Sequence, residues 1–303
     1  MQPTVRLQEK SMTNLEIGLQ VASDTRSMAL SAVKELSSFK FAHQIVRRRA
    51  IRPVDYMRYA EFDAILRDLE LNPGMRILDV SSPQWFSLYL ANKFPSVAFN
   101  YINIIDSELD PYKEIVQALG ITNLKYSKED VRDMQLRDNT FDRVVSISAI
   151  EHIYPEKDGD LKALSEINRV LKSGGEFLLT VPYKYKSNIL YRDGPVYERR
   201  ERTRNFYARE YDEEMFNKLV ERSKFSLTGS WFICERTGIL SVDYYEWGPG
   251  KDVFLAKNLI KSRMLLERIF GKSLDELLAK QYLSVSREIT GRLVNISASL
   301  KKA

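Results

Sequence analysis

The sequence predicts an α/β fold in which a doubly wound, mostly parallel sheet of seven strands carries helical additions at its N- and C-terminal ends. Three observations support this prediction. Between residues 75 and 182, short apolar runs bounded by turn residues alternate with helix-like segments, as in a parallel sheet covered by helices. Residues 1–70 space their apolar side chains at intervals of three and four, without strand alternation. A second helical stripe occupies residues 255–270.

The expected elements follow in chain order. An Asn-Pro-Gly turn at residues 72–74 leads into the first buried strand. The strands are predicted at residues 75–80, 97–105, 124–126, 143–147, 176–181, 226–234 and 253–256. The helices between them are predicted at residues 85–93, 111–119, 160–171 and 212–222.

This pattern divides the chain into three parts. Residues 1–70 are a helical cap, residues 71–257 an α/β domain, and residues 258–303 a helical C-terminal extension. Within the domain, residues 183–210 are rich in Tyr and Arg and are interpreted as a flap over a binding site, and residues 237–251 as an inserted loop. The net charge of +5 conceals an acidic middle, residues 53–182, between two basic ends, which argues against a chain-wide nucleic-acid surface.

Composition excludes several classes of protein. Cys234 is the single cysteine, so disulfide scaffolding within the chain is excluded, and a reducing, cytoplasmic setting is expected. With His43 and His152 as the only histidines, no zinc cluster and no other metal site is expected. No run approaches the roughly 18 apolar residues of a membrane span, and no secretion signal is expected at the N-terminus.

Ligands of such sheets bind where the parallel strands end, so the residues after each predicted strand are the candidate site. A pattern runs through three stretches of this part of the chain. It begins with Asp130-Val-Arg-Asp-Met-Gln-Leu-Arg-Asp-Asn-Thr-Phe-Asp142. It continues with Glu151-His152 beyond the fourth strand and with Glu166 to Pro182, which includes the fifth strand. With this register, residues 75–182 resemble the class I S-adenosylmethionine-dependent methyltransferases of the small-molecule type. The resemblance implies a Rossmann-like fold with S-adenosylmethionine as its cofactor.

The resemblance also implies cofactor-binding residues. Asp130 and the amide of Val131 would bind the adenine, since its amino group needs an acceptor and its ring a donor. Asn103 stands where the family usually has an acid for the ribose, and Asp106 follows three residues later. The further candidates for this pocket are Asp79, Ser148 and Arg58, the last for the cofactor carboxylate.

The first loop departs from the family. Three glycines are usual there, but this chain reads Asp79-Val-Ser81-Ser82-Pro83-Gln-Trp85. Left-handed geometry costs a non-glycine residue roughly 1–2 kcal/mol, and Pro83 cannot adopt positive φ, so the loop is expected to take another path. Either the hydroxyls of Ser81 and Ser82 face the methionyl group, or the pocket has lost the cofactor. A nicotinamide enzyme is disfavoured, because it needs a glycine-rich loop at this place.

Catalytic and acceptor residues are expected at the end of the fourth strand and in the flap. Methyl transfer to a hydroxyl requires a base, and His152 is the candidate, although the Glu-His pair also serves structurally in this family. Tyr183, Tyr197 and Arg199 are the candidate acceptor contacts, which suits an anionic or aromatic small molecule. Alternatively, the flap is a solvated segment whose arginines pair with Glu198, Glu201 and Glu210.

Two functions follow. The first is methyl transfer from S-adenosylmethionine to a small molecule, and the alternative is a methyltransferase-like binding or scaffold protein without the cofactor. Nucleic acid is not an expected partner, because the fourth strand ends in Ser146-Ile-Ser-Ala rather than in a Pro-Pro-Tyr type clamp for extruded bases. The basic ends, including Arg47 to Arg49, are candidates for peripheral contact with an anionic membrane or for a homodimer surface.

Overall fold

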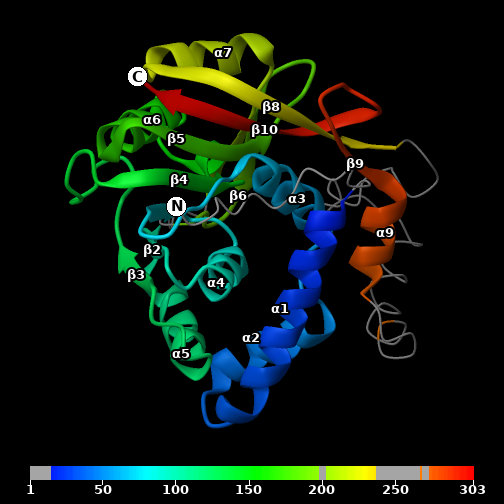
Figure 1. Ribbon diagram of the computed structural model, residues 1–303. Helices are drawn as coiled ribbons and strands as arrows, with labels where there is room; N and C mark the ends of the chain where they lie inside the picture. Colours follow the sequence, from blue (N-terminus) through cyan, green and yellow to red (C-terminus); the bar gives the residue numbers. More distant parts are fainter. Residues whose placement is uncertain (1–14, 198–202, 237–266, 268–272) are drawn as a thin grey trace.

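The computed structural model describes residues 15–197, 203–236, 267 and 273–303. Its main sheet has eight strands in the order β3-β2-β1-β4-β5-β10-β8-β9 (Figure 1). The strands β1 to β5 run parallel to one another, whereas β10, β8 and β9 are antiparallel to their neighbours. The strand order reverses between β1 and β4, which is where ligands bind in open sheets of this kind.

The described elements mostly match the prediction. The five parallel strands are β1 (Arg76–Val80), β2 (Ala98–Asn103), β3 (Leu124–Lys128), β4 (Phe141–Ile147) and β5 (Leu171–Pro182). The helices between and after them are α4 (Gln84–Lys93), α5 (Asp110–Ala118), α6 (Gly159–Val170) and α7 (Glu213–Arg222). Two short 3-10 turns, η1 (Asp106–Glu108) and η2 (Ile150–His152), follow β2 and β4.

The sheet separates two hydrophobic cores. Alternate residues of β1 point to opposite faces, so Ile77 belongs to the core with α4 and α5, and Leu78 to the core with α6 and α7. The N-terminal helices α1 (Glu16–Glu35), α2 (Lys40–Ile51) and α3 (Arg58–Asp68) extend the first core. No helix in the described residues is long and apolar enough to cross a membrane.

The strand count and the C-terminal extension were predicted incorrectly. Residues 283–302 are not helical but form β9 (Leu283–Ser286) and β10 (Arg292–Lys302), preceded by the short helix α9 (Leu274–Tyr282). The last strand, β10, lies inside the sheet between β5 and β8 (Phe225–Glu235). The sheet therefore has eight strands rather than seven, and the α/β domain does not end at residue 257.

The reason is the composition of β10. It is buried on both faces, and three of its eight buried residues are polar, namely Asn295, Ser297 and Ser299. These polar residues alternate with apolar ones from Val294 to Leu300, which is a strand pattern that the helical prediction for residues 258–303 overlooked. Asn295 donates to Glu61 at 2.8 Å, and Ser299 donates to Asp68 at 3.1 Å. Their partners lie on α3, more than 200 residues earlier, which only the folded chain reveals. The predicted strand 253–256, the inserted loop 237–251 and the stripe at 255–270 fall outside the described residues.

The predicted flap is a hairpin rather than an irregular segment. Its strands β6 (Asn188–Asp193) and β7 (Arg204–Glu210) pair antiparallel in a separate two-stranded sheet. Buried Arg209 donates hydrogen bonds to the carbonyls of Ile153 at 2.9 Å and Pro155 at 2.6 Å, and pairs with Asp160 at 3.2 Å. These bonds fix the hairpin to the chain that follows β4, so the flap has one defined position over the carboxyl end of the sheet.

Candidate active site

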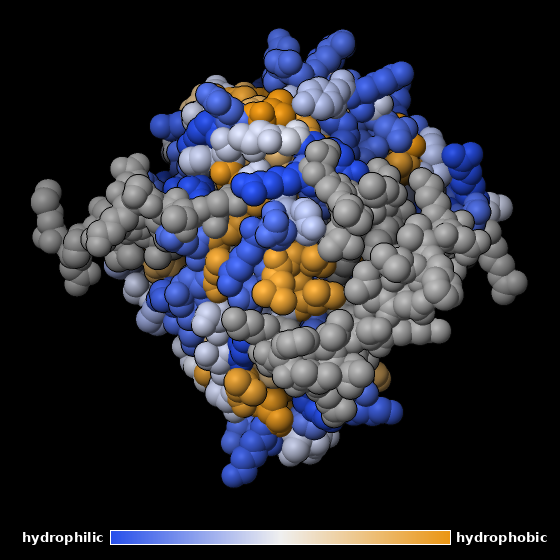
Figure 2. Space-filling model, turned by 90° about the vertical axis from the view of Figure 1, so that its right-hand side faces the viewer, coloured by the Kyte–Doolittle hydropathy of each residue, from blue (hydrophilic) through white to orange (hydrophobic). Residues whose placement is uncertain are grey.

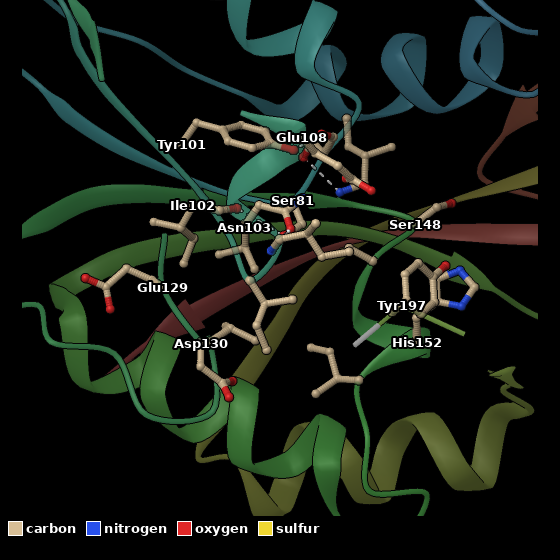
Figure 3. Close-up of a pocket in the computed structure, with 18 of the residues that line it drawn as sticks. Ser81, Tyr101, Ile102, Asn103, Glu108, Glu129, Asp130, Ser148, His152 and Tyr197 are labelled. Atoms are coloured by element: carbon tan, nitrogen blue, oxygen red, sulfur yellow. Dashed lines mark hydrogen bonds between the residues drawn. The ribbon is translucent and has the colours of Figure 1, made fainter. Parts of the chain in front are cut away.

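A cavity of about 290 Å³ lies where β1, β2, β3 and β4 end, at the reversal of strand order. This size is near the lower end of the roughly 300–1,000 Å³ of small-molecule sites. Its lining includes eight of the residues predicted for the site, namely Arg58, Ser81, Ser82, Asn103, Asp130, Val131, Ser148 and His152, together with Tyr197 from the flap. In Figure 3, His152 and Tyr197 lie together on one side, apart from Glu129 and Asp130 on the other.

The loop after β1 is held by its serines. Ser81 adopts positive φ (55°), and both its amide and its hydroxyl donate to the carbonyl of Ile102 at 3.0 Å. Ser82 is buried, and its hydroxyl accepts from the amide of Ile147 at 3.1 Å. The hydroxyls thus connect β1 to β2 and β4, so the loop takes a serine-stabilised path with one left-handed residue, and the cavity remains.

Asp79 does not line the cavity but stabilises the loop after β1 through hydrogen bonds. It is buried, it accepts from the amide of Ser82 at 3.0 Å, and it accepts from the hydroxyl of Ser87 on α4. Burial raises the pKa of Asp79 to about 6, against the opposing effect of the bonds from Ser87 and Ser82. Asp79 is therefore placed as a support of the loop.

The end of β2 supplies a different acid from the one predicted. Asn103 lines the cavity and accepts from the amide of Ile105 at 2.8 Å. Asp106 does not line it and instead points to solvent, 4.0 Å from Lys113. Glu108, which sequence reasoning missed, lines the cavity because the turn η1 brings it round beside Asn103. Burial raises the pKa of Glu108, and a hydrogen bond with Asn103 opposes that shift.

The end of β3 brings Glu129, Asp130 and Val131 to the cavity. Asp130 is paired with Arg132, whose guanidinium donates to it at 2.5 and 2.9 Å. Burial favours the protonated form, but these bonds with Arg132 outweigh it and lower the pKa of Asp130. The carboxylate is therefore charged and already holds one cation.

His152 lies on the opposite side of the cavity. Its Nδ1 is 2.8 Å from the carbonyl of Tyr207, and its ring packs against Tyr197 and Tyr207, with ring centres 5.2 and 4.9 Å away. A carbonyl only accepts, so we assign the hydrogen to Nδ1, which leaves the lone pair on Nε2. Burial lowers the pKa of His152 to about 4, so the imidazole is neutral near pH 7.

Glu151 is the neighbour of that lone pair, with its Oε1 3.6 Å from Nε2 of His152. Burial raises the pKa of Glu151 to about 8, because the charged form would be desolvated. At neutral pH this pair is therefore a protonated carboxyl beside a neutral imidazole.

Glu61 on α3 contacts two residues that line the cavity, Arg58 and Ser148, and sequence reasoning missed it too. It is fully buried and accepts from the hydroxyls of Ser148 and Thr180, the latter at 2.8 Å, and from Asn295. It also pairs with Arg58, one turn earlier on the same helix. A carboxylate at a helical apolar position has no distinguishing pattern in the sequence, so only its partners reveal its role.

Of the two described flap candidates for the acceptor contacts, one lines the cavity. Tyr183 does not line the cavity, because its ring packs edge-on to Phe216 of α7 in the second core. Arg199 lies outside the described residues. Two of the described arginines stack on aromatic rings: Arg192 lies 3.4 Å from the ring centre of Tyr207, and Arg204 lies 4.8 Å from that of Tyr191. Glu198 and Glu201, two of the acids in the alternative interpretation, lie outside the described residues. Of the two described candidates, Tyr197 lines the cavity and Tyr183 does not.

Comparison with known proteins agrees with this geometry. Residues 79–179 match the family described as "Methyltransferase domain". These residues form a methyltransferase domain, in agreement with the resemblance of the sequence to the class I S-adenosylmethionine-dependent methyltransferases. The match runs from the last residues of β1 into β5 and contains the ends of β1, β2, β3 and β4, which face the cavity. It agrees with S-adenosylmethionine as the expected cofactor.

Two relatives of the methyltransferase domain share 31% identity with this chain. One is the cyclopropane-fatty-acyl-phospholipid synthase of Escherichia coli (strain K12), over 122 residues, or 40% of this chain and 29% of that protein. The other is the sterol 24-C-methyltransferase of Yarrowia lipolytica, over 169 residues, or 52% of this chain and 40% of that protein. The chain thus spans less than half the length of either. An S-adenosylmethionine-dependent methyltransferase from Mesorhizobium loti has a similar structure, with a TM-score of 0.45, 14% identity, and coverage of 80% of this chain and 97% of that one.

Proposed function

We propose that this protein transfers a methyl group from S-adenosylmethionine to an uncharged, largely apolar small molecule. The proposal rests on one observation: the cavity where the strand order reverses has a polar side and an aromatic side. The ends of β2 and β3 supply Asn103, Glu108 and Asp130 on one side, and η2 and the flap supply His152 and Tyr197 on the other. A polar side suits a nucleoside, and an aromatic side suits an acceptor.

The polar side has the hydrogen-bonding groups that the cofactor needs. Asn103 and Glu108 would accept from the two ribose hydroxyls, since both reach the cavity from the end of β2. Asp130 and the amide of Val131 would bind the adenine. Arg58 would face the methionyl carboxylate, held in place by its ion pair with Glu61. Bound here, S-adenosylmethionine supplies an electrophilic methyl group whose sulfur leaving group departs neutral.

On the other side, His152 would accept the proton that the acceptor loses. With a pKa of about 4, its imidazole is a weak base, so it removes a proton only from a strongly acidic group. Methyl transfer to a hydroxyl gives an oxonium ion, and methyl transfer to an alkene carbon gives a carbocation; both are strongly acidic. Methyl transfer to an amine gives an ammonium ion, which is not. The site therefore favours an oxygen or an alkene carbon as the methyl acceptor.

The charges around the cavity favour an uncharged acceptor over the anionic one that the sequence also allowed. Both arginines that line the cavity are paired, Arg58 with Glu61 and Arg132 with Asp130. The names of the two relatives point the same way, because a fatty-acyl phospholipid and a sterol carry large apolar parts.

Two measurements test the proposal. Calorimetric titration with S-adenosylhomocysteine should give a Kd of about 1–100 µM, that is, roughly −8 to −5 kcal/mol. Incubation of a cell extract with radiolabelled S-adenosylmethionine should then place the label in the fraction soluble in organic solvent. Folded protein that binds no S-adenosylhomocysteine would support the alternative scaffold function, and label confined to water-soluble products would contradict the acceptor class.

A further inference from the structure

The outer end of the N-terminal cap exposes apolar and basic side chains together. We call this the α1–α2 surface; its apolar members are Leu30, Phe39, Phe41 and Ile51, and its cations are Lys34, Lys40, Arg47 and Arg48. Phe41 is 68% exposed and Leu30 59% exposed. Figure 2 shows hydrophobic side chains beside hydrophilic ones at the lower end of the molecule, where the hairpin of α1 and α2 lies in Figure 1.

The α1–α2 surface has a helical register. Phe41, Arg48 and Ile51 are spaced by seven and three residues, so they share the solvent face of α2, while Ala42 and Val46 form its buried face. Single exposed apolar residues are ordinary on soluble proteins. Here Phe39 and Phe41 flank Lys40 where α2 begins, and Arg48 and Ile51 lie on the same face as Phe41. Such a combination of aromatic, apolar and basic residues is typical of helices that lie in a membrane interface.

The charge of this surface is one-sided. Between Asp24 and Asp55 the only acidic residue is Glu35. Arg48 lies 3.7 Å from Asp55, but Lys34, Lys40 and Arg47 have no ion pair within the described part of the chain. These three cations outnumber the single acid Glu35 and complement an anionic surface, each strengthening binding to it by about fivefold.

We propose that the α1–α2 surface docks this protein on anionic phospholipid bilayers, with Phe39, Phe41 and Ile51 entering the headgroup region and the four cations contacting lipid phosphates. The inference goes beyond the proposed function, because docking requires neither the cofactor nor the acceptor. It also places the cavity near the bilayer. The helix α2 ends at Ile51, and Arg58, which lines the cavity, follows seven residues later. Even a fully extended chain of this length limits the distance between the backbones of Ile51 and Arg58 to about 25 Å.

Flotation of the full-length protein with vesicles tests the docking surface. Vesicles of phosphatidylcholine with about one-third phosphatidylglycerol should bind the protein at least tenfold more strongly than vesicles of phosphatidylcholine alone. Phe41→Ser and Arg47→Glu should each reduce binding to the anionic vesicles by about fivefold or more. Leu227→Ser, at an exposed apolar residue of β8, should leave binding unchanged and serves as the matched control.

Three results would overturn the inference: no binding to anionic vesicles, equal binding by all the variants, or a dimer in light scattering that Phe41→Ser dissociates in protein that binds no vesicles. The last result would identify the surface as a contact between two copies of this chain. Titration of Phe41→Ser with S-adenosylhomocysteine should give the wild-type Kd, so that loss of docking is distinguished from failure of the cofactor site.

Discussion

The two sides of the cavity are built in different ways. The side formed by the ends of β2 and β3 consists of acids and amides that reach the cavity through short local turns, as Glu108 does through η1. The side around His152 depends on contacts between distant segments, because Tyr197 and Tyr207 come from the flap and pack on η2. Cofactor binding is therefore expected to tolerate changes in the flap, whereas acceptor chemistry depends on it.

The largest effect is expected from His152→Phe. The variant keeps a ring between Tyr197 and Tyr207 but has no nitrogen, so methyl transfer should slow by about 10²–10⁴-fold. The Kd for S-adenosylhomocysteine should change less than about threefold. Initial rates with labelled cofactor measure the first quantity and calorimetry the second. His43→Phe, at the other histidine, is the control, and equal rates for the two variants would remove His152 from the chemistry.

Glu61→Ala should affect both sides at once. It removes the acceptor for Ser148, Thr180 and Asn295 and leaves Arg58 without this ion pair, so the free energy of unfolding should fall by about 2–4 kcal/mol. Denaturation in urea measures the loss. Glu61→Gln keeps an acceptor oxygen and should lose less stability. A stable Glu61→Ala variant with unchanged S-adenosylhomocysteine affinity would show that the two sides are independent.

Glu108→Ala should weaken the cofactor side alone. Loss of one carboxyl acceptor for the ribose should raise the Kd for S-adenosylhomocysteine by about 10-fold, equivalent to roughly 1.4 kcal/mol. Asp106→Ala is the matched control, because that acid faces solvent and should leave the Kd unchanged. If Asp106→Ala were the weaker binder, the ribose would be bound by the acid that the sequence predicted.

Glu151 should make stability depend on pH. Between the ordinary pKa of 4.5 and the raised value of about 8, folded Glu151 holds a proton that the unfolded chain releases, so its own contribution to stability falls as pH rises through this range. Glu151→Gln cannot ionise. Its stability relative to wild type should therefore increase by roughly 1 kcal/mol or more from pH 5 to pH 8 and stay level above that. Thermal unfolding at matched pH values measures this, and a constant difference would mean that Glu151 is not protonated in the folded protein.

The smallest effect is expected from Ser81→Gly, which restores a glycine to the first loop. Glycine adopts the positive φ of this residue freely, which should stabilise the fold by about 0.5–1 kcal/mol, less the lost hydrogen bond to Ile102. Thermal unfolding should show a small rise in Tm or none. A clear fall would mean that the hydroxyl, rather than the backbone geometry, holds the loop.

The sequence by itself determined the parallel half of the fold and most of the cofactor side. The alternation of short strands and helices over residues 75–182 is a local pattern, and strand ends in a parallel sheet meet at one edge, so Asn103, Asp130, Ser148 and His152 could be placed together without a structure. The sequence pointed to Asp106, which does not line the cavity, and gave no sign of Glu108, which does, because the path of a three-residue turn decides which of two nearby acids faces inward.

Only the tertiary structure decided the rest. The strand β10 carries buried polar residues whose partners lie on α3, so its place between β5 and β8 follows from contacts across more than 200 residues of sequence. The same contacts make Glu61 a centre of the site, and burial within the fold sets the opposite pKa shifts of Glu151 and His152. Hydrogen-bond satisfaction and desolvation depend on what surrounds a residue in space, and the order of residues along the chain does not contain that information.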